Sequence, residues 1–202
     1  MISERPLTCL ITRGELTPEN FEQRKVEIID TVEAAARADI SMVQIREKAI
    51  TAKQLYTLAV ECVSAAGGSE TKILVNSRSD IAKAANADGV HLPEDSVPVE
   101  EIRKTFPPPF LIGRSAHSLD VARSAKNDGA DFVIFGAIFE SGGKKGKGAE
   151  ELAKVCGELD GFPVLAVGGI DHDNIQAILD TGVAGYAAIR YLNEKVLESK
   201  RR

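Results

Sequence analysis

The sequence predicts a single α/β domain with the fold of a closed (β/α)8 barrel. Short aliphatic and β-branched runs alternate eight times with segments of helical hydrophobic spacing along the 202 residues. Such an alternation gives either a closed eight-stranded barrel or an open doubly wound sheet. We favour the barrel because the units number eight, the last unit ends the chain, and barrels begin at about 200 residues.

Each predicted strand is an apolar run with turn-forming or polar residues at its ends. The runs are residues 7–12, 42–46, 72–76, 89–92, 110–115, 131–136, 163–169 and 185–192. Apolar residues recur at three- and four-residue steps in 21–38, 80–86, 99–105, 119–128, 149–159 and 171–181, which predicts helices there. Gly129, Gly161 and Gly182 follow predicted helix ends, where a left-handed cap is favoured. We see no linker or composition shift, so residues 1–202 form one domain.

Composition and charge exclude several classes of protein. The formal charge of −5 argues against nucleic-acid binding, which normally needs a basic surface. No apolar run reaches the roughly 20 residues of a membrane span, and the first residues do not resemble a signal peptide. The three cysteines are distant from one another and lack zinc spacing. We therefore expect a cytoplasmic protein with reduced cysteines and no membrane or nucleic-acid partner.

The stretch 131–148, DFVIFGAIFESGGKKGKG, combines a buried strand with a loop rich in glycine and lysine. Glycine lets a backbone approach a ligand closely, and lysine brings positive charge to the same place. This combination indicates a small phosphorylated ligand, which we expect Lys144 and Lys145 to contact.

Polar side chains follow almost every predicted strand. The carboxyl ends of the strands meet at one end of a barrel, where barrel enzymes place their active sites. We expect the substrate-binding residues to be Gln44, Arg46, Asn76, Arg78, Ser115, Lys144 and Lys145. His91 lies within a strand, so we expect it to be structural, buried and hydrogen-bonded, whereas His172 is expected to face solvent.

The residues 166–174, AVGGIDHDN, predict a phosphate site. They end a buried strand with Gly168 and Gly169 and then begin a helix, with Asp171 or Asp173 as the expected N-cap. Backbone N–H groups at such a helix start attract an anion. Because barrels often bind phosphate after strands seven and eight, we add Ile189 and Arg190 to this site.

Six motifs in order resemble those of the thiamine phosphate synthase/TenI superfamily. They are VQIREK (43–48), LVNSRSDIA (74–82), GVHLPED (89–95), IGRSAHS (112–118), GADFVIFGAIFES…KKG (129–146) and PVLAVGGI (163–170). The resemblance covers nearly the whole chain. It implies a (β/α)8 barrel, a homodimer, and a thiazole phosphate as the small-molecule partner.

The resemblance also implies a choice between two enzymatic branches. The synthase joins a pyrimidine methyl diphosphate to a thiazole phosphate and uses Mg²⁺ held by two aspartates, whose places here hold Ser77 and Ser96. Its Thr-x-Thr-Lys stretch is replaced by FESGGKKG, which is closer to the TenI branch of thiazole tautomerases. We therefore expect no metal site and no cofactor. Mg²⁺ would be required if Glu94, Asp95 or Asp80 rebuilt the synthase site.

A tautomerase needs a general acid or base near neutral pH, most readily a histidine. The TenI-type pattern FGHxFE carries one, but Ala137 stands in its place here. We expect the catalytic groups to be His117, Lys48 and Glu47. The leading hypothesis is a TenI-like isomerase. The alternatives are a thiamine phosphate synthase with a rebuilt Mg²⁺ site, and a non-catalytic regulatory protein that binds thiazole or thiamine phosphate.

Overall fold

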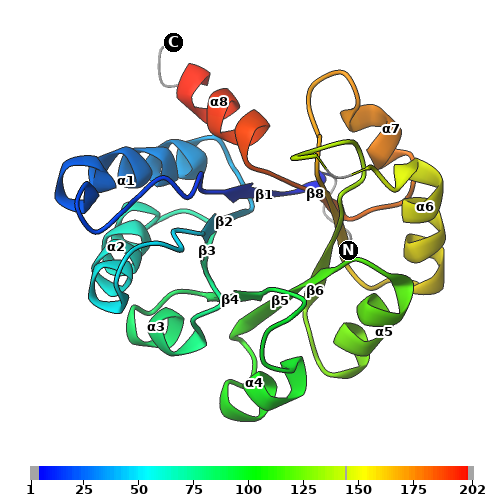
Figure 1. Cartoon of the computed structure of the whole chain (residues 1–202), viewed down its shortest axis with the longest axis horizontal. Helices are drawn as coiled ribbons and strands as arrows, with labels where there is room; N and C mark the ends of the chain where they lie inside the picture. The colour runs from blue at the N-terminus through cyan, green and yellow to red at the C-terminus, as the bar shows by residue number, and fades with distance from the viewer. Residues whose placement is uncertain (1–4, 144, 200–202) are drawn as a thin grey trace.

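Eight parallel strands close into a barrel in the order β1 to β8, and β1 pairs with both β2 and β8. The computed structural model describes residues 5–143 and 145–199. The strands are β1 Leu7–Ile11, β2 Met42–Ile45, β3 Lys72–Asn76, β4 Gly89–Leu92, β5 Leu111–Ala116, β6 Phe132–Gly136, β7 Val164–Val167 and β8 Gly185–Ala188. The ring of helices around them is visible in Figure 1. The predicted (β/α)8 barrel is confirmed.

One helix follows each strand and covers the outside of the barrel (Figure 1). The helices are α1 Phe21–Arg37, α2 Ala52–Ala65, α3 Ser79–Ala84, α4 Val99–Thr105, α5 Leu119–Asn127, α6 Gly148–Glu158, α7 Ile175–Leu179 and α8 Arg190–Ser199. Local signals set some of their starts. Thr51 and Gln54 form a reciprocal capping box at α2, and the Ser118 hydroxyl accepts from the backbone N–H of Val121 at α5.

The strands are buried on both faces, which explains their nearly continuous apolar runs. Alternate residues point into the barrel and form an inner cluster: Cys9, Ile11, Met42, Leu74, Phe132, Ile134, Leu165 and Ala187. The others pack against the helices in a larger outer cluster. Gly113 makes room for the inner cluster, since a Cβ there would lie 2.2 Å from Cζ of Phe132.

Two predicted elements near the carboxyl end of the chain need correction. The predicted strand 185–192 ends at Ala188, and α8 begins at Arg190. The predicted helix 171–181 shrinks to Ile175–Leu179. Asp171 is not its N-cap, because Oδ1 of Asp171 accepts from the N–H groups of Asp173 and Asn174 and so closes a turn before the helix.

Among the described residues, no helix is long and apolar enough to cross a membrane. Cys9, Cys62 and Cys156 are unpaired. Burial raises the pKa of the Cys9 thiol, which lies inside the barrel, to about 12, so this group is a packing residue and not a nucleophile.

Candidate functional site

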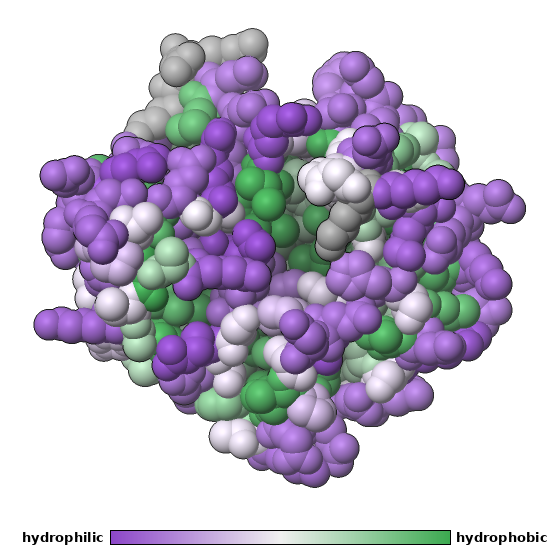
Figure 2. All heavy atoms as spheres, in the orientation of Figure 1, coloured by the Kyte–Doolittle hydropathy of each residue, from purple (hydrophilic) through white to green (hydrophobic). Residues whose placement is uncertain are grey.

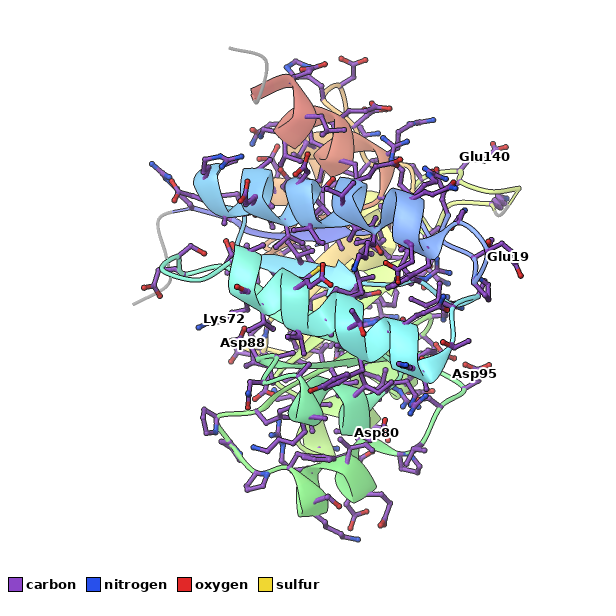
Figure 3. The ribbon with its side chains drawn as sticks, turned by 90° about the vertical axis from the view of Figure 1, so that its left-hand side faces the viewer. Glu19, Lys72, Asp80, Asp88, Asp95 and Glu140 are labelled. Carbon is purple, nitrogen blue, oxygen red and sulfur yellow. The ribbon has the colours of Figure 1, made fainter. Side chains whose placement is uncertain are left out.

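A cavity of about 790 Å³ opens at the carboxyl ends of the strands, and we call it the central cavity. Each strand, or the loop that follows it in sequence, contributes to the lining of this cavity. The lining residues are Ile11, Gln44, Arg46, Lys48, Asn76, His91, Pro93, Glu94, Asp95, Ser115, His117, Ile134, Gly136, Ala137, Ser141, Gly142, Val167, Gly168 and Ile189. Figure 2 shows this end of the barrel hollowed at its centre, with apolar side chains deep in the hollow and hydrophilic ones around it. In Figure 3, Glu19, Asp95 and Glu140 mark the same end, and Lys72 and Asp88 mark the opposite one.

The deep part of the central cavity contains two buried polar side chains, Gln44 and His91, which are 1% and 4% exposed. Within the described part of the chain, Nε2 of Gln44 and both ring nitrogens of His91 have no hydrogen-bond partner. The prediction that His91 is buried is confirmed, but the predicted hydrogen bond is wrong. Its strand turns the ring inward, where its neighbour is the ring of Phe132 at 6.4 Å between centroids.

The charge state of His91 follows from its position. Burial, helped by the positive charges of Arg114 and Arg46, lowers the pKa of the imidazole to about 3. The ring is therefore neutral at physiological pH and has one N–H donor and one acceptor nitrogen.

The upper wall of the central cavity is polar and cationic. Arg46, Lys48, Asn76 and Ser115 all line it, as the sequence predicted. The side-chain amide of Asn76 donates to the hydroxyl of Ser77 at 2.8 Å. Arg46 and Lys48 bring two positive charges to a cavity that Glu94 and Asp95 also line, so cationic groups that could contact an anion lie beside carboxylates that could hold a cation.

Glu47, predicted as a catalytic group, does not line the central cavity but a neighbouring cleft, which it shares with Lys48. Its carboxylate is buried and accepts from the Thr12 hydroxyl at 2.6 Å, the Gly14 N–H at 3.0 Å and the Leu16 N–H at 2.9 Å. The Thr12 hydroxyl accepts in turn from the Arg46 N–H at 2.8 Å. Glu47 therefore holds the loop after β1 against the end of β2, and both of its carboxylate oxygens are engaged in these contacts.

Arg78 and the loop lysines also depart from prediction. Arg78 pairs with both carboxylate oxygens of Asp80, which lowers the pKa of that carboxyl, and it lines a separate cleft of about 330 Å³ beside α3. Lys145 is exposed and does not line the central cavity, and Lys144 lies outside the described residues. Lys147 has contacts of its own, since its Nζ lies 3.5 Å from Oε1 of Glu151 and 5.8 Å from the Phe135 ring centroid.

A second pocket of about 420 Å³ adjoins the central cavity, and we call it the glycine pocket. It is lined by Glu140, Ser141, Gly142, Val167, Gly168, Gly169, Ile170, Ala187, Ala188, Ile189 and Arg190, so the four predicted phosphate-binding residues are brought together. Helix α8 begins at Arg190 and directs its N-terminus to this pocket. Free backbone N–H groups at a helix start suit an anion.

Glycine is required at positions 168 and 169 by the backbone and by the neighbouring loop. Their φ angles are +98° and +65°, in the left-handed region that favours glycine. A Cβ at Gly168 would lie 2.5 Å from Cβ of Ala137, and one at Gly169 would lie 2.7 Å from Cβ of Phe139. The floor of the glycine pocket is therefore bare backbone packed under the β6–α6 loop.

His117 and Glu94 form a pair at the mouth of the central cavity. Nδ1 of His117 lies 2.6 Å from Oε2 of Glu94, and the His117 backbone N–H donates to the same oxygen at 2.7 Å. Arg114 holds the loop that carries Glu94 by donating to the carbonyl oxygens of Glu94 and Val97 and to the Ser96 hydroxyl. The sequence analysis predicted neither this pair nor the role of Arg114. The feature that could have indicated a role for Arg114 is its position as a charged residue within the predicted strand 110–115.

The carboxylates available to a magnesium ion at the cavity mouth are few. Glu94 and Asp95 line the cavity, whereas Asp80 is paired with Arg78. The described residues contain no group of three or more histidine, cysteine or acidic side chains suited to a metal. Mg²⁺ is often held by one or two carboxylates plus substrate phosphates. Asp95 and Glu94 supply that number of carboxylates, so a magnesium site here would need the substrate phosphates as further ligands.

Fold and cavity together define a (β/α)8 barrel protein with a polar cavity at the carboxyl ends of its strands. The chain belongs to the TMP-TenI family, described as thiamine monophosphate synthase, whose model matches residues 10–192. This confirms the superfamily expected from the motifs, which functions in thiamine biosynthesis, without singling out the TenI branch.

Named relatives and a solved structure agree with this family. The chain is 35% identical over 188 residues to a thiamine-phosphate synthase of Chlorobium luteolum, covering 91% of this chain and 84% of that protein. It is 36% identical over 166 residues to one of Clostridium novyi, covering 80% and 81%. Thiamine phosphate pyrophosphorylase from Pyrococcus furiosus superposes with a TM-score of 0.80 at 28% identity, covering 96% and 94%. These names favour the synthase alternative over the tautomerase that we expected first.

Proposed function

We propose that this protein is a thiamine phosphate synthase, which joins a pyrimidine methyl diphosphate to a thiazole phosphate with loss of diphosphate. The observation that carries the proposal is the pair of adjoining sites. A central cavity of about 790 Å³, lined by Arg46 and Lys48 among other residues, adjoins a glycine pocket of about 420 Å³ whose lining includes the backbone of Gly168 and Gly169 and one arginine. The names of the relatives support the reaction.

The two sites suggest separate roles for the residues that line them. In this proposal, the backbone of Gly168 and Gly169 and the side chain of Arg190 hold the thiazole phosphate. Arg46 and Lys48 stabilise the negative charge that develops on the departing diphosphate. Holding both substrates in one cavity accelerates bond formation by orientation alone.

The ion that the reaction uses has a limited set of ligands here. When bound, Mg²⁺ supplies charge neutralisation to the leaving diphosphate. Asp95 and Glu94 would hold it, and the serines at positions 77 and 96 would contribute at most neutral oxygens. We therefore expect weaker magnesium binding than a pair of dedicated aspartates would give, and a requirement for the diphosphate substrate to complete the ligand shell.

The direct test is product formation. The purified protein is incubated with the pyrimidine diphosphate, the thiazole phosphate and Mg²⁺, and thiamine phosphate is measured by chromatography. We expect metal-dependent product, and a loss of activity in Asp95→Asn that added Mg²⁺ partly restores. The matched control is Asp173→Asn, an exposed carboxylate outside both cavities. Absence of product from a folded protein would refute the proposal, and if thiazole phosphate still bound by calorimetry, a regulatory binding protein would remain.

A second candidate, a thiazole isomerase, is favoured by the contact between His117 and Glu94. A carboxylate on Nδ1 of a histidine fixes its tautomer and leaves Nε2 to accept or donate a proton. Isomerisation of an unaromatised thiazole carboxylate phosphate is the assay that distinguishes this candidate. Activity that survives His117→Ala unchanged would exclude His117 as the base.

A further inference from the structure

Two asparagine side chains hold the backbone of the glycine pocket from outside its lining. The pocket is built from two chain segments, the turn at 168–170 after β7 and the start of α8 at Ile189. Nδ2 of Asn174 donates to the Gly169 carbonyl at 2.8 Å, and Nδ2 of Asn193 donates to the Ile189 carbonyl at 2.6 Å. Each segment of the pocket therefore has a backbone carbonyl that is held by an asparagine amide.

Asn193 also compensates for the early end of β8. The ladder between β1 and β8 ends at the pair Leu10–Ala188, so the Ile11 carbonyl lies beyond the last paired residue. The Asn193 amide, which is 3% exposed, donates to this carbonyl at 2.9 Å. Because both of its partners are carbonyl oxygens, the atom between them must be the amide nitrogen.

The bond from Asn193 to Ile11 frees a backbone donor. The Leu7 N–H donates to the Ala184 carbonyl, and the parallel ladder repeats this pattern in steps of two residues. Two such steps further along, the Ile11 carbonyl would accept from the Arg190 N–H. The Asn193 side chain takes that place, so the chain can turn into α8 with the Arg190 N–H unused.

Asn174 acts in a similar way on the turn after β7. While its Nδ2 holds the Gly169 carbonyl, its Oδ1 accepts from the Asp171 N–H at 3.0 Å, so both ends of the amide are fixed. In a trans peptide the C=O and N–H groups point in opposite directions. Holding the Gly169 carbonyl therefore directs the Ile170 N–H, which belongs to the same peptide unit, the other way.

The two N–H groups that these bonds orient belong to residues of the pocket lining. Ile170 and Arg190 both line the glycine pocket. Within the part of the chain that the structure describes, neither of their N–H groups has a hydrogen-bond acceptor. Oriented backbone N–H groups in a concave site bind anions.

We propose that Asn174 and Asn193 are positioning residues, which aim the N–H groups of Ile170 and Arg190 at the phosphate of the substrate. The proposal rests on the proposed function, since it takes the glycine pocket as the site of the thiazole phosphate. Neutral N–H groups bind a phosphate well when they point at it, and their direction is set by the carbonyl at the other side of each peptide unit. The phosphate affinity of the pocket then depends on two side chains outside its lining.

Binding of inorganic phosphate to the full chain, measured by calorimetry, tests the proposal without turnover. Asn174→Leu and Asn193→Leu keep a side chain of similar size but remove the amide. We expect each to weaken phosphate binding about tenfold, which is the effect of one misdirected charge-assisted hydrogen bond. Asn174→His places a ring N–H near the position of the amide nitrogen and should recover part of the affinity.

A second variant covers the buried position. The hydroxyl of Asn193→Ser can still donate to the Ile189 carbonyl one helical turn back, but the bond to Ile11 is lost. This variant should also weaken phosphate binding, because the Ile11 carbonyl then competes with the ligand for the Arg190 N–H.

The loop after β1 offers a matched control. Asn20 precedes α1 as Asn174 precedes α7. Its Nδ2 donates to the Glu15 carbonyl, five residues back, at 3.1 Å, and its Oδ1 accepts from the Thr17 N–H, three residues back, at 2.8 Å. Asn20→Leu removes the same two kinds of bond in a loop outside the glycine pocket, so phosphate affinity should not change.

A merely structural role would lower stability without acting on one substrate. In the synthase assay we expect Asn174→Leu to raise KM for the thiazole phosphate about tenfold and to leave KM for the pyrimidine diphosphate within about twofold. Unchanged phosphate affinity in folded Asn174→Leu or in the folded Asn193 variants would overturn the role of that residue. Equal weakening in Asn20→Leu, or a wild-type protein that does not bind phosphate, would overturn the whole proposal.

These results are distinguishable from failure of the proposed reaction. If the protein forms no thiamine phosphate, yet phosphate binding weakens in Asn174→Leu and not in Asn20→Leu, the positioning role stands and the synthase assignment falls. If thiamine phosphate forms and both leucine variants leave KM for the thiazole phosphate unchanged, the synthase stands and the positioning role falls.

Discussion

Replacing Glu47 should destabilise the fold strongly, although the residue lies between two side chains of the cavity wall. Its carboxylate accepts three hydrogen bonds from the loop after β1, from the Thr12 hydroxyl and the N–H groups of Gly14 and Leu16. Because it is 3% exposed, water cannot replace these bonds when the side chain is shortened. Glu47→Ala therefore leaves two N–H groups and a hydroxyl without their acceptor.

The magnitude follows from the number of bonds lost. A hydrogen bond to a charged group contributes about 1.5–3 kcal/mol, and breaking a buried charged network costs about 3–5 kcal/mol in all. We expect about 4 kcal/mol for Glu47→Ala. For Glu47→Gln we expect about 2 kcal/mol, because an amide keeps one acceptor oxygen but turns a donor toward a donor. For a domain of this size these values correspond to falls in Tm of about 8–16 °C and 4–8 °C.

The assay is urea denaturation followed by circular dichroism, with the midpoint compared at constant m-value. Glu33→Ala is the matched control, because Glu33 is half-exposed and its ion pair with Arg37, at 3.2 Å, lies at the surface, so its loss should cost less than about 1 kcal/mol. If Glu47→Ala unfolded within about 0.5 kcal/mol of the wild type, the assignment of Glu47 as the structural link would be wrong, and its predicted catalytic role would return.

Three further predictions follow from the site. The His91 imidazole, with a pKa lowered to about 3, should not titrate by NMR between pH 5 and 8. Since the unfolded histidine binds a proton near pH 6.5, this residue makes stability fall as the pH drops from about 6.5 toward 3, and His91→Phe should flatten that dependence. Gly168→Ala should abolish phosphate binding and destabilise by more than Gly182→Ala, because both have positive φ but only the first Cβ meets a neighbour, at 2.5 Å. Calorimetry with inorganic phosphate and a melting curve check both variants. Ala137→His should create or raise thiazole isomerase activity, since position 137 lines the central cavity, and a folded variant without a gain would count against the alignment of strand six.

Much of the fold could be predicted because barrel strands are marked locally. A strand buried on both faces has an unbroken apolar run, and runs such as Phe132–Gly136 and Val164–Val167 need no distant information to be found. Gly168 and Gly169 were found in the same way, since adjacent glycines after a buried strand indicate a backbone turn. The end of β8 was harder to place, because Ile189, Tyr191 and Leu192 are as apolar as strand residues, yet α8 begins at Arg190.

The sequence predicted which residues line the central cavity, but it did not predict which of their neighbours they contact. Gln44, Arg46, Lys48, Asn76 and Ser115 line the central cavity because the rim of a barrel collects the strand ends. The pairing of Arg78 with Asp80 was not predicted, although the two are only two residues apart. The charge of a side chain in the sequence does not reveal whether that side chain contacts a substrate or pairs with a neighbouring residue.

By itself, the sequence determined the barrel, its family and the backbone of the glycine pocket, since periodicity and glycine act over a few residues. Only the tertiary structure decided the partners of each polar group. It joins the Glu47 carboxylate to the loop after β1 and Glu94 to His117 across 23 positions of sequence. Among the described residues, it gives the buried ring nitrogens of His91 no hydrogen-bond partner. These outcomes depend on strand register and on which side chains meet inside a closed sheet. No local pattern encodes that.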